Sequence, residues 1–80
     1  MEDEQIRGAA REVVADVLEL DGLELDDGAR FTELGADSIQ QLQIVAALRT
    51  RFGVRYSLSE ESRLGSVDDA VEITRAHLRR

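Results

Sequence analysis

The sequence contains no cysteine, no proline and no tryptophan, and its only aromatic residues are two phenylalanines and one tyrosine. Without cysteine the chain can form neither disulfides nor thiolate metal sites, and this composition fits a reducing cytoplasm. With so few large aromatic side chains, the hydrophobic core has to be aliphatic. Because neither proline nor a low-complexity segment marks a linker, we expect residues 1–80 to form a single domain.

Long hydrophobic runs are also missing from the chain. No apolar stretch approaches the length of a membrane span, and residues 1–4 (Met-Glu-Asp-Glu) are acidic where a secretory signal would be basic and then apolar. We therefore expect a cytoplasmic protein that does not associate with membranes. A first helix that begins almost at the first residue suits a free-standing protein better than a segment of a larger chain.

Basic charge is scarce, since ten arginines stand against seventeen acidic residues, which gives a formal net charge of −7. This charge repels nucleic acids and anionic membranes and favours encounter with basic protein surfaces. A domain of this size has a stability of only about 3–5 kcal/mol, which leaves little room for a large active-site cavity. We expect a monomer that binds other proteins and is not an enzyme.

Hydrophobic periodicity predicts an all-α, four-helix bundle with three main helices and one short helix. The first helix covers about residues 3–19, and an acidic, glycine-punctuated loop follows over residues 20–37. The second helix covers about residues 38–52, a helix of one or two turns ends near residue 65, and the last begins after residue 66. The long loop after the first helix is the kind of segment that carries function in a compact domain.

Each segment contributes apolar residues at helical spacing or, in the loop, as anchors. They are Ile6, Ala9, Ala10, Val13, Val14, Val17 and Leu18 in the first helix; Leu20, Leu23, Leu25, Phe31 and Leu34 in the loop; Ile39, Leu42, Val45, Ala46, Leu48 and Phe52 in the second helix; and Val67, Ala70, Val71, Ile73, Thr74 and Leu78 in the last.

Ser38 is the strongest candidate for a functional residue because it stands at the predicted start of the second helix. Asp37 can act as the N-cap, with Gln40 three residues later as the returning side chain of a capping box. Ser38 then occupies the first helical position, where unpaired N–H groups and the positive end of the helix dipole favour an attached phosphate. Ser57 and Ser66 each precede an acidic residue by three positions, so we interpret both as N-caps.

Two other kinds of site are disfavoured. A serine hydrolase needs a base that reaches Ser38, but the only histidine is His77 in the last helix, and no Gly-x-Ser-x-Gly elbow is present. We interpret His77 as a solvated helix residue. The acidic loop fails the EF-hand pattern, because with Gly28 in the glycine position Leu23 and Leu25 fall where ligands belong. We expect no specific metal site.

Residues 31–39 (Phe-Thr-Glu-Leu-Gly-Ala-Asp-Ser-Ile), with Leu42 and Val45 at helical spacing and residues 51–54 (Arg-Phe-Gly-Val) closing the helix, resemble the acyl carrier protein family. The resemblance covers almost the whole chain. It implies that Ser38 carries 4′-phosphopantetheine transferred from coenzyme A, and that the terminal thiol of this group holds an acyl chain as a thioester. It also implies a cleft for that chain, lined here by Val45, Ala46, Leu48 and Ile73.

The second helix departs from the family pattern. Many members carry carboxylates there that dock basic partners, whereas this helix presents Gln40, Gln41 and Gln43, and no acidic residue lies between Ser38 and Ser59. We therefore expect the partner-facing negative charge to come from the loop and the short helix. The expected partner-binding residues are Asp26, Asp27, Glu33, Ile39, Ala46, Glu60 and Glu61, with Asp37 adding charge beside the attachment site.

A glutamine-rich second helix and the tripeptide Asp-Ser-Ile resemble carriers of polyketide and peptide assembly lines. The resemblance implies a phosphopantetheinyl transferase, a ketosynthase and an acyltransferase as partners. We expect a carrier of polyketide, and hence antibiotic, biosynthesis first, a peptidyl carrier second and a carrier of fatty acid biosynthesis third. An acidic adaptor that binds a basic protein without any modification is the alternative from a different functional class.

Overall fold

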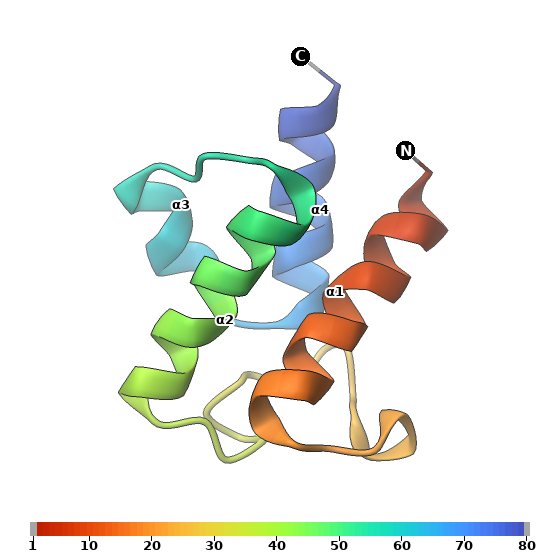
Figure 1. The fold of residues 1–80 in the computed structure, drawn as a ribbon, viewed down its shortest axis with the longest axis vertical. Coiled ribbons are helices and arrows are strands. Elements are labelled where there is room, and N and C mark those ends of the chain that lie inside the picture. The colour runs from red at the N-terminus through yellow and green to blue at the C-terminus, as the bar shows by residue number, and fades with distance from the viewer. Residues whose placement is uncertain (1, 80) are drawn as a thin grey trace.

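Four α-helices form the protein in a computed structural model that describes residues 2–79. They are α1 (Asp3–Leu18), α2 (Ser38–Phe52), α3 (Leu58–Arg63) and α4 (Val67–Leu78). Figure 1 shows three long helices, α1, α2 and α4, with the short α3 beside α2. The helix α1 packs against both α2 and α4. The predicted all-α fold class is confirmed.

Local signals set several of the helix ends, as the sequence predicts. The backbone N–H groups of Glu60 and Asp69 donate to the hydroxyls of Ser57 and Ser66, at 3.1 Å in each case, and so cap the starts of α3 and α4. Gly53 follows α2 with a φ of +64°, a left-handed conformation that costs glycine little. These ends depend on residues close together in the chain.

The buried faces of α1 and α4 agree with the predicted spacing. Tyr56, which precedes α3, lies against this core, and its hydroxyl is 2.7 Å from that of Thr74 in a buried hydrogen bond. Leu78, the last residue of α4, was expected in the core but is 40% exposed. The buried residues of the two helices are Ile6, Ala9, Ala10, Val13, Val14, Val67, Ala70, Val71, Ile73 and Thr74.

The buried face of α2 differs from the predicted stripe. Ile44, which the stripe left out, is fully buried together with Leu48. Ile39 and Leu42 are 67% and 69% exposed, and Ala46 is also exposed. Apolar residues lie on more than one side of α2, so spacing alone could not identify the row that meets α1. For Ile39, Leu42 and Ala46 as core residues, the prediction is wrong.

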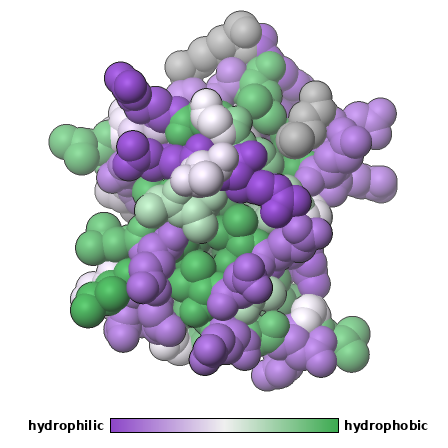
Figure 2. Space-filling model, in the orientation of Figure 1, coloured by the Kyte–Doolittle hydropathy of each residue, from purple (hydrophilic) through white to green (hydrophobic). Residues whose placement is uncertain are grey.

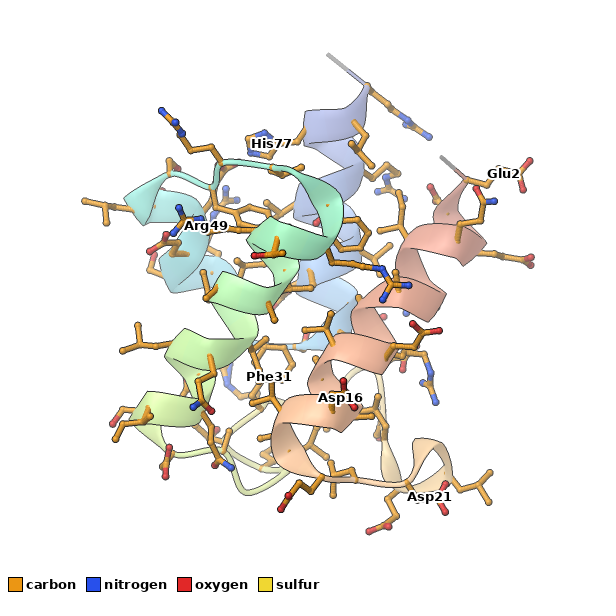
Figure 3. The ribbon with its side chains drawn as sticks, viewed as in Figure 1. Glu2, Asp16, Asp21, Phe31, Arg49 and His77 are labelled. Carbon is orange, nitrogen blue, oxygen red and sulfur yellow. The ribbon has the colours of Figure 1, made fainter. Side chains whose placement is uncertain are left out.

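The loop between α1 and α2 is anchored at several points. It contains a 3₁₀ turn, η1 (Gly22–Glu24), that the sequence did not predict. Phe31 is almost fully buried, points toward the middle of the bundle in Figure 3, and donates its N–H to the Gly65 carbonyl at 2.8 Å. Leu25 is buried as expected, but Leu23 is 96% exposed because it lies on the outer side of η1.

An ionic cluster joins this loop to α1 and α4. The Arg7 guanidinium donates to the carboxylates of Asp27 and Asp68, at 2.7 and 2.6 Å, and Arg11 donates to Asp27 as well. The N–H of Asp68 donates to the Asp27 carbonyl at 3.0 Å. Asp27 therefore stabilises the path of the loop. Within residues 2–79, no helix has both the length and the apolarity that a membrane span requires.

Candidate functional site

Ser38 is the first residue of α2 and is exposed. The predicted capping box is present: the Asp37 carboxylate accepts from the N–H of Gln40 at 2.8 Å, and the Gln40 side-chain oxygen accepts from the N–H of Asp37 at 3.0 Å. The hydrogen bonds among residues 2–79 leave the N–H groups of Ser38 and Ile39 without a protein acceptor. Free donors and the helix dipole thus make the surroundings of the Ser38 hydroxyl favourable for an anion.

The segment before Ser38 is fixed to the core. Ala36 is buried, and its N–H donates to the carbonyl of Phe31 at 2.9 Å. Gly35 has a φ of +95°, so the chain turns here in a conformation that a residue with a side chain would strain to adopt. Because Phe31 is itself buried, the position of Ser38 follows from the packing of the loop.

An apolar hollow of about 320 Å³ lies directly beside Ser38, between α2 and α3. Figure 2 shows hydrophobic side chains at the left edge of the molecule, where Figure 1 places these two helices. The hollow is wide enough to shelter a short chain attached at the serine. It is lined by Ser38, Gln41, Leu42, Val45, Glu61 and Leu64.

The four predicted cleft residues do not line one hollow, although Leu48 and Ile73 belong to the same core and Val45 packs against it. Of the four, only Val45 lines the hollow beside Ser38. Leu48 is fully buried, Ala46 lines a hollow at the other end of α2, and Ile73 lines a third hollow together with Arg30 and Asp69. A cleft lined by all four residues therefore stays a prediction, and Val45 is the one of them that lines the hollow beside Ser38. Helical spacing from Ser38 could have identified the α2 side of the hollow, but not the residues from α3.

The predicted partner-binding acids fall into two groups. Asp27 is held by Arg7 and Arg11, so its charge is compensated within the protein. Glu60 is also engaged: its side chain is 13% exposed and it accepts from the N–H of Ser57 at 2.8 Å. The remaining acids are at least partly accessible: Asp26, Glu33 and Asp37 are exposed, and Glu61 is half-buried beside Ser38.

His77 is not the solvated residue that we expected. Its side chain is 14% exposed, its Nε2 lies 2.8 Å from the Glu60 carboxylate, and its ring meets Tyr56 edge to face, with centroids 5.7 Å apart. The Ser57 N–H and then His77 lower the pKa of Glu60 to about 2. Figure 3 shows His77 at the opposite end of the molecule from the start of α2, where Ser38 lies. It cannot serve Ser38 as a catalytic base.

Comparison with known proteins gives a consistent result. Residues 9–73 match the family model described as a phosphopantetheine attachment site. A polyketide-8 synthase acyl carrier protein 2 of Streptomyces avermitilis is 39% identical over 69 residues, which cover 85% of this chain and 79% of that protein. An acyl carrier protein of Solidesulfovibrio magneticus is 32% identical, covering 76% of this chain and 80% of that protein. An acyl carrier protein of Clostridium acetobutylicum is 31% identical, covering 84% of this chain and 88% of that protein.

Proposed function

Because the chain belongs to the acyl carrier proteins, non-catalytic proteins whose cofactor is 4′-phosphopantetheine, we propose that Ser38 is the residue that bears this group. The observation that carries the proposal is the position of Ser38 as an exposed first residue of a capped helix, beside an apolar hollow. The bound group would supply a thiol that holds acyl groups as thioesters, which this cysteine-free chain does not have.

The residues around Ser38 fit such a group. The free N–H groups of Ser38 and Ile39 and the positive end of α2 favour the phosphodiester, and Asp37 is occupied in the cap. The hollow beside Ser38 offers apolar surface from Leu42, Val45 and Leu64 to whatever the thiol carries.

The other serines fit less well. Ser57 and Ser66 cap α3 and α4, and Ser66 is buried. The Ser62 hydroxyl donates to the Ser59 carbonyl at 2.7 Å. Ser59 is exposed but follows the start of a helix of six residues. Ser59 therefore offers a matched control for Ser38.

We infer that the cargo is a polyketide intermediate. The support is the similarity to a protein whose name places it in a polyketide synthase, at 39% identity against 32% and 31% for relatives named only as acyl carrier proteins. A phosphopantetheinyl transferase, a ketosynthase and an acyltransferase are then the expected partners, and action as a cytoplasmic monomer stays a prediction. Loading the modified protein with malonyl groups by a malonyl transferase, but not with amino acids by an adenylating enzyme, would support this cargo over an aminoacyl or peptidyl one.

Attachment is tested by the intact mass of the purified protein after incubation with coenzyme A, magnesium and a broad-specificity phosphopantetheinyl transferase. We expect the wild type and Ser59→Ala to gain one phosphopantetheinyl group, and Ser38→Ala to gain none while its circular dichroism stays helical. A mass gain in Ser38→Ala, or no gain in folded wild type, would overturn the assignment, and the latter result would point to an unmodified adaptor.

A further inference from the structure

One row of α2 is exposed along its whole length in the described structure. Starting from the residue after Ser38, Ile39, Leu42, Ala46 and Arg49 recur three or four positions apart, and all four are exposed. The row is apolar near Ser38 and becomes basic at the C-terminal end of the helix, from which the Arg49 side chain extends in Figure 3. A protein that contacts Ser38 can also contact this row, because the row begins at the next residue.

The surface at the basic end of the row is only slightly concave. A hollow of about 470 Å³ is lined there by residues of α2 and the chain that follows: Ala46, Arg49, Thr50, Gly53, Val54 and Arg55. It begins about 12 Å along the helix from Ser38, at 1.5 Å per residue over the eight positions to Ala46. Both ends of the row fit within one protein interface of ordinary size.

The charge of this end opposes that of the rest of the molecule. Between Ser38 and Ser59 there are three arginines and no acidic residue, although the net charge of the chain is −7. Arg51 forms an ion pair with Glu12 at 2.9 Å. Arg49 and Arg55, which line the hollow, form no ion pair or side-chain hydrogen bond with any residue in the range 2–79.

The folding of the helix accounts for only part of this pattern. A cation in the last turn of α2 suits the helix dipole, which explains Arg49 and Arg51. Arg55 lies beyond the terminating Gly53, is exposed, and gains nothing from the dipole. Two uncompensated guanidinium groups on one hollow are suited to bind carboxylates, to whose oxygens they donate hydrogen bonds.

We propose that this hollow binds a carboxylate-bearing surface of a partner protein, so that partners approaching Ser38 along α2 meet Arg49 and Arg55 with acidic residues. The inference rests on the carrier function proposed above and names the chemistry of the partner's surface. The exposed apolar side chains of Ile39 and Leu42 favour a protein over a free anion, because a small anion would not cover them.

The test is a titration of the ¹⁵N-labelled protein with a hexaglutamate peptide, followed by NMR at low salt. We expect the amide signals of Arg49, Thr50, Gly53, Val54 and Arg55 to move, and the Arg49→Gln/Arg55→Gln variant to bind about fivefold to tenfold more weakly. The control variant Arg63→Gln/Arg79→Gln removes the same charge from other exposed sites and should bind as the wild type does.

Equal weakening in both double variants, or signal changes elsewhere than the hollow, would overturn the proposal. Inorganic phosphate provides a second arm: if it moves the same signals with equal or higher affinity, the hollow takes a free anion and the proposal is wrong. Titrations are repeated with Ser38→Ala, and the mass assay is run on both double variants. The titrations report on the hollow and the mass assay reports on attachment at Ser38, so failure of one proposal is distinguishable from failure of the other.

Discussion

The Glu60 carboxylate lies 2.8 Å from the His77 imidazole and thereby joins α3 to α4. Glu60 also accepts from the N–H of Ser57, so one side chain completes the start of α3 and fastens this short helix to the bundle. A helix of six residues has little stability of its own, so α3 depends on such contacts. Because α3 contributes Glu61 to the hollow beside Ser38, the pair also supports one wall of the candidate site.

We expect acid to weaken this connection. The folded protein lowers the pKa of Glu60 from 4.5 to about 2, so its stabilising effect is complete above pH 4.5 and is lost as the pH falls through 2. Glu60→Gln should therefore melt below the wild type at pH 6, and the difference should shrink between pH 4.5 and 2. Thermal melting followed by circular dichroism between pH 2 and 6 measures the difference in melting temperature. Glu61→Gln, which leaves the Glu60–His77 contact intact, is the control; a difference that does not change with pH would contradict the prediction.

The buried hydrogen bond between Tyr56 and Thr74 predicts a non-additive pair of mutations. Tyr56→Phe leaves the Thr74 hydroxyl buried without this partner, which should cost about 1–3 kcal/mol in the free energy of unfolding. Adding Thr74→Val removes the unpaired hydroxyl, so the double variant should lose less than the sum of the two single losses. Urea unfolding of the wild type, the two single variants and the double variant gives the coupling free energy between the two side chains. Additive losses would show that the two hydroxyls do not stabilise the protein through a shared hydrogen bond.

The cap of α2 predicts different effects for two changes at one residue. Asp37→Ala removes the acceptor for the Gln40 N–H and should cost about 0.5–2 kcal/mol, whereas Asp37→Asn keeps a capping oxygen and should cost much less. Chemical unfolding measures both. Equal losses would mean that the charge of Asp37, and not its cap, stabilises the start of α2.

Two neighbouring acids in the loop should differ in their effect on stability. Asp27 is bound by two arginines, so Asp27→Asn should cost about 1 kcal/mol, while Asp26→Asn should change the free energy of unfolding by no more than about 0.5 kcal/mol. The cost at Asp27 should fall in 1 M salt, which screens the pairs. Denaturant unfolding at two salt concentrations checks this, and a salt-independent cost would argue against the ionic explanation.

Short-range sequence patterns were sufficient to predict the starts of α2, α3 and α4, and so to identify Ser38 as the first residue of α2. The caps at Asp37, Ser57 and Ser66 are hydrogen bonds between residues three positions apart. They can therefore be recognised from the sequence without knowledge of the tertiary structure. The same holds for Gly53, whose left-handed conformation ends α2. The strong apolar stripes of α1 and α4 were likewise readable because each helix has a single apolar face.

Only the packing of the helices decided the rest, because the contacts concerned join residues far apart in the chain. The row of α2 that is buried depends on where α1 lies, and spacing could not distinguish the row of Ile44 from that of Ile39. His77 and Glu60 are 17 residues apart, and Arg7 and Asp27 are 20. The sequence alone determined which side chains were able to cap a helix, enter the core or form an ion pair. Which of these contacts form was decided by the close packing of all the helices against one another, because the free energy of packing depends on the whole bundle.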